Sequence, residues 1–243
     1  ITSNGQVNVD SNSVVTTGQW YHVVGTYDGS TMKFYVNGTL QNSASQTGNI
    51  IRTTNQPIYL NYQNVGTAEY QDSTLTGGKM DGNQDDLRIW SRALSATEVS
   101  SLYSAGREDS RTLTTGLTAH YNLDSDASAT VGTDGTVSGA TFATAGGRSY
   151  ASFDGSNDTI NLGDRDEFEV NATDSRTFSL WFKLDSSASS GFMHLLNKRN
   201  VSSNNNGWAL YKESNNALAF QLVSGGTNAA YIVTNSALSN NTW

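Results

Sequence analysis

The 243-residue chain contains no cysteine and a single proline, Pro57. Without cysteine the protein has no disulfide bonds and no thiolate metal ligands, a composition compatible with an exported protein. No run of apolar residues is long enough to cross a membrane, so we expect no membrane insertion. Positive charge is also scarce, because 14 lysines and arginines face 22 aspartates and glutamates, which gives a net charge of −8. This balance disfavours nucleic acid and anionic membranes as partners.

Glycine, asparagine, serine and threonine are abundant, and they favour short strands joined by turns over long helices. The length suits either one large all-β domain or two small ones. The clearest pattern lies at residues 18–38, where aromatic and apolar residues alternate on both sides of Asp28-Gly29. Alternation around an Asp-Gly pair predicts a β-hairpin. A second turn is expected at Asn37-Gly38.

This hairpin resembles the centre of a laminin G-like (LamG) domain, a concanavalin A-like or pentraxin-like jelly roll. The shared features are a Trp-x-His-Val strand, a Tyr-Asp-Gly turn and a Lys-x-Tyr-Val-Asn-Gly strand, which occur here at residues 20–23, 27–29 and 33–38. The resemblance implies an all-β fold, a concanavalin A-like antiparallel β-sandwich.

Residues 80–99 resemble the end of the same family, whose last strand typically runs Gly-x-Ile-Asp-Asp-Val-Arg-Ile-Tyr before a short helix. Gln84 stands where the family has an apolar residue, which changes local packing. Ser95 and Glu98 have the spacing of a helix N-terminal capping box, and Gly106 is placed to end the helix. We therefore expect one short helix after the last strand.

The opening strands of a LamG domain come only after this closing block. Residues 116–124 resemble the first strand and residues 153–163 the third, whereas residues 107–115 are polar and indicate a linker. The chain thus shows the end of a domain before a beginning. We predict the C-terminal half of one LamG-like domain at residues 1–106 and the N-terminal half of the next at residues 116–243.

An internal repeat supports this division. Residues 11–20 align with residues 234–243, and subtracting 20 from 243 gives a repeat of 223 residues, about one LamG domain. Two interpretations stay open: a window on tandem repeats, or halves that close on each other, within the chain as one permuted sandwich or between chains. In both, neither half alone should be stable, because each would expose sheet edges and half a core.

The resemblance also implies a structural calcium site, since LamG and pentraxin-like domains often bind Ca²⁺ through carboxylate and carbonyl oxygens. Strand alternation places Asp158 on the side of Ile160 and Asp85 on the side of Leu87, so a shared cation would neutralise both carboxylates at the apolar face. The candidate ligands are Asp154, Asn157, Asp158, Asp85 and Asp86. The alternative is turn chemistry, in which these side chains cap their own loops.

The resemblance also makes carbohydrate binding a natural expectation for this fold. Tyr62 and Tyr70 flank an irregular stretch and are the candidate sugar-stacking residues. Four tryptophans fall in strand patterns and are expected in the core: Trp20, Trp90, Trp181 and Trp208.

Catalysis is not expected. Retaining glycosidases need two carboxylates about 5 Å apart, typically from a Glu-x-Asp-x-x-Glu strand. The acidic cluster at residues 164–169 lacks this pattern and is expected to be a solvated loop.

We therefore expect a non-catalytic LamG-like module of a repetitive extracellular or cell-surface protein, acting in adhesion or carbohydrate binding. Its partners would be glycans or other copies of the repeat. The alternative is a purely structural filament subunit, completed head to tail by neighbouring half-domains. A second alternative is a glycoside hydrolase on the same fold.

Overall fold

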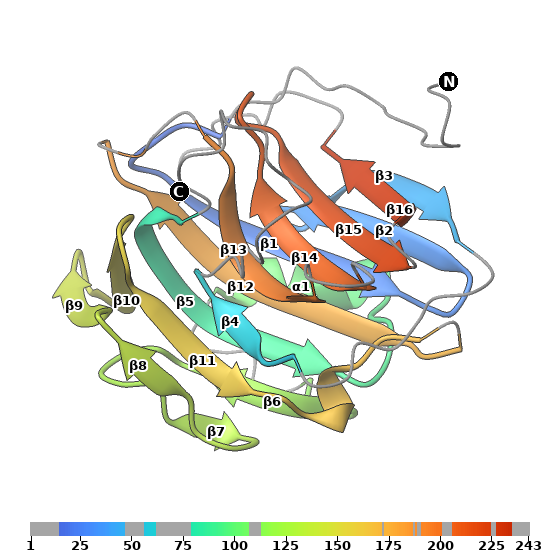
Figure 1. Cartoon of the computed structure of the whole chain (residues 1–243), viewed down its shortest axis with the longest axis horizontal. Helices are drawn as coiled ribbons and strands as arrows, with labels where there is room; N and C mark the ends of the chain where they lie inside the picture. The colour runs from blue at the N-terminus through green and yellow to red at the C-terminus, as the bar shows by residue number, and fades with distance from the viewer. Residues whose placement is uncertain are drawn as a thin grey trace.

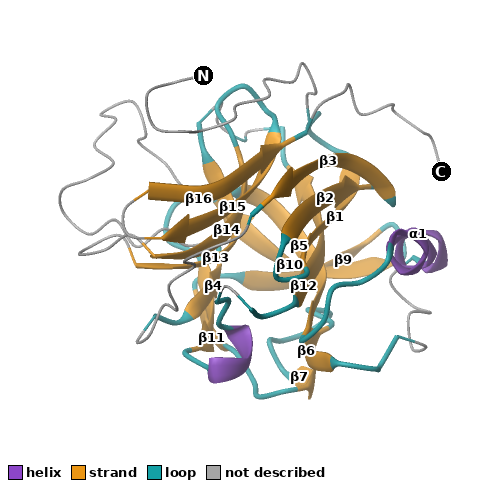
Figure 2. Ribbon diagram, turned by 90° about the vertical axis from the view of Figure 1, so that its right-hand side faces the viewer, coloured by secondary structure: helices purple, strands orange, loops and turns teal. Residues whose placement is uncertain are grey.

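A computed structural model describes residues 15–46, 56–61, 79–106, 113–171, 173–186, 188, 191–200, 206–224 and 227–234. Two antiparallel sheets pack face to face, and one helix lies outside them (Figure 1, Figure 2). The predicted all-β sandwich is confirmed. Within the described residues, no helix has the length and apolar character needed to cross a membrane.

Sheet A is built from strands on both sides of the chain's midpoint. Its members are β1 (Trp20–Tyr27), β2 (Thr31–Val36), β3 (Thr39–Ser45), β5 (Asp81–Trp90), β6 (Leu117–Tyr121), β7 (Ala129–Val131), β9 (Thr141–Ala145), β10 (Arg148–Asp154) and β12 (Arg176–Leu184). Their order is β3-β2-β1-β12-β5-β10-β9, with β6 paired to β5 and β7 paired to β6.

Sheet B faces it. Its members are β4 (Ile58–Leu60), β8 (Thr136–Ser138), β11 (Thr159–Gly163), β13 (Met193–Asn200), β14 (Asn206–Lys212), β15 (Leu218–Ser224) and β16 (Thr227–Val233). Their order is β16-β15-β14-β13-β4-β11-β8. A short 3₁₀-helix, η2 (Asp166–Phe168), lies between β11 and β12.

The two predicted halves of the chain interleave in both sheets. In sheet A, β1 and β5 flank β12, and β5 also pairs with β10. In sheet B, β4 lies between β13 and β11. Strands from before and after residues 107–112 therefore alternate within one sandwich, while the tandem-repeat interpretation stays a prediction.

The opening hairpin is confirmed. β1 and β2 pair through a turn in which Asp28 Oδ1 accepts hydrogen bonds from the backbone N–H groups of Ser30, at 2.9 Å, and Thr31, at 2.7 Å. Gly29 has a φ of +92°, which explains why glycine follows the aspartate. In the second turn, Asn37 Oδ1 accepts a hydrogen bond of 2.9 Å from the backbone N–H of His22.

The main core lies between the sheets and follows from strand alternation. In β12, Phe178, Leu180 and Phe182 face sheet B and are fully buried. Opposite them Gly25 leaves room for the ring of Phe220, since a Cβ at position 25 would lie 2.9 Å from that ring. The two sheets can therefore approach closely at this point.

The helix α1 (Ala96–Ala105) begins with the predicted capping box, in which Ser95 and Glu98 bond each other's backbone N–H groups. Gly106 ends it with a φ of +65°. Val99 and Leu102 pack with Val24, Tyr35 and Trp90, on the face of sheet A that is turned away from sheet B. We call this the outer face of sheet A (Figure 2).

Residues 164–169 are not the solvated loop that the sequence predicts. Phe168 lies in the main core, and Glu169 is only 3% exposed. The fully buried ammonium of Lys198, on β13, ion-pairs with Asp164 at 2.7 Å and with Glu169 at 3.2 Å. A buried cation requires nearby anions, so Glu169 turns inward, while Asp164 and Asp166 stay exposed.

Candidate functional site

A strip of aromatic and charged side chains lies on the outer face of sheet A. Strand pairing places Trp20, Lys183, Asn83 and Ser152 in one row across β1, β12, β5 and β10. The outer strip, as we name it, consists of residues Trp20, Asn83, Asp85, Arg148, Tyr150, Trp181 and Lys183.

Alternation along the strands produces this strip. In β1, Tyr21 and Val23 face the main core, so Trp20 and His22 project outward. In β12, Phe182 faces the core, so Trp181 and Lys183 project outward for the same reason. Trp20 and Lys183 are half-buried, whereas Trp181 is only 1% exposed.

The guanidinium of Arg148 is held between two indole rings. Its Cζ lies 4.3 Å from the ring centroid of Trp20 and 4.7 Å from that of Trp181. The ring centroids of Trp20 and Tyr150 are 5.6 Å apart, and Lys183 Nζ lies 5.8 Å from the Trp20 ring and 5.6 Å from the Tyr150 ring. Each cation–π contact contributes about 0.5–1 kcal/mol at such sites. These contacts hold the partly exposed ring of Trp20 in one orientation on the outer face of the sheet.

Asp85 also lies on the outer face, which corrects the orientation predicted from alternation. β5 carries a β-bulge, because Trp181 pairs with Asp85 while Ser179 pairs with Arg88, so two residues of β5 oppose one of β12. Asp86, within the bulge, has a φ of +49°. The bulge reverses the alternation, so Leu87 faces the core and Asp85 does not. Asp85 Oδ2 lies 3.7 Å from Arg148 Nε.

Asp86 is engaged by two neighbouring side chains. Its Oδ1 lies 2.8 Å from Arg88 Nη2 and 2.9 Å from His120 Nε2. Arg88 and His120 are paired across β5 and β6, so the carboxylate sits between them. This arrangement neutralises a largely buried aspartate without a metal ion.

His22 and Ser179 form a buried polar pair beside the strip, with 2.8 Å between His22 Nε2 and Ser179 Oγ. Burial lowers the pKa of His22 to about 4, so the ring is neutral at pH 7. The ring of Trp181 lies 4.9 Å from it, and Tyr103 of α1 lies 6.2 Å from it. Nδ1 of His22 is buried without a hydrogen-bond partner. Because Tyr103 belongs to α1, the helix covers the part of the outer face that contains His22.

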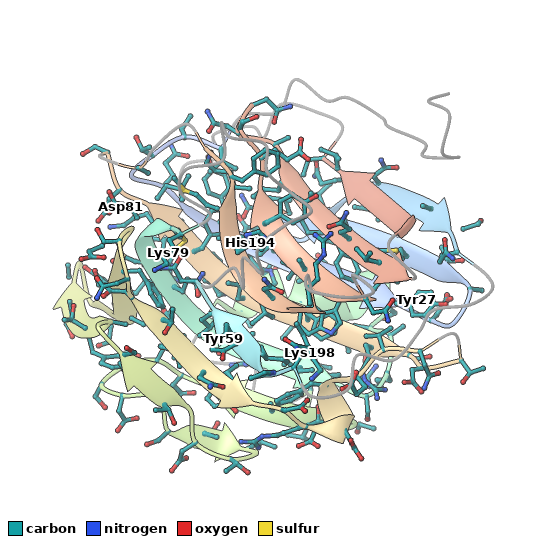
Figure 3. All side chains as sticks on the ribbon, viewed as in Figure 1. Tyr27, Tyr59, Lys79, Asp81, His194 and Lys198 are labelled. Atoms are coloured by element: carbon teal, nitrogen blue, oxygen red, sulfur yellow. The ribbon has the colours of Figure 1, made fainter. Side chains whose placement is uncertain are left out.

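The remaining candidate metal ligands lie in the turn between β10 and β11. Asp158 Oδ2 accepts a hydrogen bond of 2.9 Å from the backbone N–H of Asp154, whose own Oδ1 accepts one of 2.8 Å from Ser156. Asn157 is exposed. Lys79, seen in Figure 3 at the same end of the sandwich as Asp81, donates a hydrogen bond of 2.7 Å to the carbonyl of Ser156. These contacts are the turn chemistry that the sequence offered as the alternative to calcium.

The five candidates thus fall into two groups, with Asp85 and Asp86 on β5 and Asp154, Asn157 and Asp158 in the β10–β11 turn. Across the part of the chain that the structure describes, no group of three histidine, aspartate or glutamate side chains is arranged to hold a metal ion. The calcium site stays a prediction.

The candidate sugar-stacking residues Tyr62 and Tyr70 lie outside the described residues. Of the four tryptophans, Trp208 lies in the main core and Trp90 lies under α1, as expected for buried residues. Trp181, on the outer face, is only 1% exposed and so is buried as predicted, whereas Trp20 is half-buried and departs from the prediction. Strand alternation in the sequence indicates the outward position of Trp20, because Trp20 lies on the strand side opposite to Tyr21 and Val23.

Comparison with protein-family models finds a match for the first part of the chain. Residues 1–100 match the Laminin_G_3 model, described as the concanavalin A-like lectin/glucanases superfamily. No curated protein and no solved structure matches the chain. The matched range includes the opening hairpin and the strand β5 that carries Asp85 and Asp86. Residues 1–100 are therefore similar to the laminin G-like family of the concanavalin A-like lectin/glucanases superfamily.

Proposed function

We propose that the protein is a non-catalytic carbohydrate-binding module and that the outer strip is its binding surface. The observation that carries this proposal is the half-buried ring of Trp20, held in place by Arg148, Tyr150 and Lys183. A fixed aromatic face beside a few polar groups suits a ligand with apolar and hydroxyl-bearing sides. A pyranose ring has both.

The polar groups of the strip complement such a ligand. Lys183 is half-buried and carries hydrogen-bond donors. Asn83, its neighbour in the same row, donates a hydrogen bond of 3.2 Å to Asp185 Oδ1. Lys183 can bond sugar hydroxyls while Trp20 stacks on the ring, whereas Asn83 is only 3% exposed and braces Asp185 beneath the strip.

The environment of Asp85 supports a role without catalysis. Its side chain is 1% exposed and lies 3.7 Å from the guanidinium of Arg148. A glycosidase nucleophile or acid must reach the scissile bond. Asp85 instead acts as a buried counter-ion that orients Arg148 between the two indole rings.

The test is glycan-array screening followed by calorimetry with the best ligand, for the wild type and Trp20→Ala. We expect affinity to fall by about five- to thirtyfold, because removal of one stacking face costs about 1–2 kcal/mol. The matched control is Tyr59→Ala, which removes a half-buried aromatic ring from β4 on the opposite sheet (Figure 3). A silent array, or equal affinity for Trp20→Ala and the wild type, would reject the outer strip as a sugar site.

We further propose that this binding serves adhesion at a cell surface or outside the cell. The absence of cysteine and the net charge of −8 are compatible with that setting. Fractionation of the cells that make the protein, with detection by antibody, tests the location. Recovery only from the cell interior would contradict it.

A further inference from the structure

The strands of residues 15–106 and those of residues 113–234 complete each other. β12 lies between β1 and β5, so both of its edges would be unpaired without residues 15–106. β13 and β11 would likewise lose β4, which pairs with both. Unpaired edges recruit another strand. Residues 113–234 therefore need a complement that supplies β1, β4 and β5.

The complement also supplies buried polar contacts that span the two segments. Gln84 Nε2, on β5, donates a hydrogen bond of 2.9 Å to the carbonyl of Leu195 on β13. Asn61 Nδ2 donates one of 3.2 Å to the carbonyl of Asp158. Such bonds depend on geometry, so they favour this specific pairing over any other strand.

The start of one segment and the end of the other meet at a single turn, which joins β14 to β15. The backbone N–H of Val15 donates a hydrogen bond of 3.0 Å to the carbonyl of Asn216. The backbone N–H of Thr234 donates one of 3.0 Å to the carbonyl of Leu218, two residues further on. The two hydrogen bonds are each 3.0 Å long, and Asn216 and Leu218 are two residues apart. The backbone nitrogens of Val15 and Thr234 therefore lie within about 13 Å of each other.

The internal repeat provides a sequence that could bridge this distance. Because residues 234–243 repeat residues 11–20, Leu238 is the counterpart of Val15, since 238 minus 223 is 15. The four residues from Thr234 to Leu238 span about 13–14 Å when extended. The repeated sequence therefore has the length needed to join Thr234 to a segment that begins at Val15.

We propose that residues 15–106 are an exchangeable complement of residues 113–234, and that the partner is a second copy of this chain. Residues 113–234 of one copy bind residues 15–106 of the next through the contacts made within a single chain. Such head-to-tail pairing extends into a linear array where the rotation between successive copies does not close a ring.

The test mixes two full-length variants that each disable one segment. Gly82 has a φ of +153°, and a Cβ there would overlap the backbone carbonyl of Lys183, so Gly82→Val disables every sandwich built with that copy of residues 15–106. Gly207 has a φ of +127°, and a Cβ there would overlap the carbonyl of Lys198, so Gly207→Val disables residues 113–234. Each variant retains the segment that the other has lost.

After unfolding and refolding together, the two variants should regain native tryptophan fluorescence and a cooperative unfolding transition, with one native sandwich for every two chains. Neither variant should do so alone. The control is a mixture of two differently tagged Gly82→Val chains, which should not recover. A mixed sample that equals the sum of the separate samples would overturn the exchange.

A permuted chain gives a second and independent measurement. It joins residue 234 directly to residue 12, so that residues 113–234 precede residues 12–112. We expect a folded monomer whose thermal unfolding transition matches that of the parent, because the junction copies the internal repeat. If the permuted chain fails to fold, residue 234 cannot be joined directly to the segment that begins near Val15, and the proposal is rejected.

Discussion

The neutral, buried imidazole of His22 should make the protein labile in mild acid. Burial lowers its pKa from 6.5 to about 4. Between these two pH values the unfolded chain binds a proton that the folded chain does not bind. Stability is therefore complete above pH 6.5 and declines as the pH falls towards 4. A shift of about 2.5 units at 1.36 kcal/mol per unit corresponds to about 3 kcal/mol.

The assay is urea denaturation, followed by tryptophan fluorescence, at a series of pH values from above 6.5 down to about 4. His22→Phe keeps a ring beside Trp181 and Tyr103 but cannot titrate, so its stability should decline less over this range. The variant loses the 2.8 Å contact with Ser179, so the comparison uses the pH dependence and not the absolute stability. His120→Gln, which changes a partly exposed histidine on the same face, is the control. Parallel pH profiles for the wild type and His22→Phe would refute the reasoning.

Two other properties follow from the structure. Hydrogen bonds from Arg92 lower the pKa of Glu98 to about 2, so its contribution to stability is present above pH 4.5 and disappears as the pH falls towards 2. Glu98→Gln should therefore lower the free energy of unfolding by about 1 kcal/mol at neutral pH, and by less in strong acid; an equal effect at both pH values, in chemical denaturation, would contradict this. The melting temperature with and without a calcium chelator decides between the two predictions for Asp154 and Asp158: turn chemistry alone leaves it unchanged, and a rise on adding calcium would support the calcium site.

Local patterns predicted the local structure well. The Asp28-Gly29 turn and the Ser95–Glu98 capping box each depend on residues within three positions of one another, and both form as expected. Nothing distant is needed to specify them, because each satisfies backbone N–H groups of its own segment.

Predictions that depended on strand alternation were less secure. α1 packs on the outer face of sheet A, so β5 is buried on both sides and its apolar pattern does not distinguish them. The bulge at Asp86 then reverses the alternation within the same strand. For this reason alternation assigns Asp85 to the wrong face. The prediction that Trp20 lies in the core is wrong as well, because Trp20 is half-buried on the outer face.

The buried ion pair between Lys198 and Glu169 could not be predicted from the sequence. Lys198 and Glu169 are separated by 29 positions, and only the pairing of β13 with β4 brings the lysine under η2. Neither residue carries a local signal of burial, since lysine and glutamate are ordinarily exposed.

The carbohydrate site and the exchange of segments share one structural requirement. Trp20 and Asp85 belong to residues 15–106, whereas Arg148, Tyr150, Trp181 and Lys183 belong to residues 113–234. The outer strip therefore exists only where the two segments meet. If the complement comes from a neighbouring copy, each sugar site is assembled between two copies, and ligand affinity reports on their pairing. In the mixed-variant experiment, recovery of glycan binding that depends on Trp20 in the Gly207→Val partner would connect the two proposals. Recovery of folding without binding would leave the exchange standing and reject the strip as the sugar site.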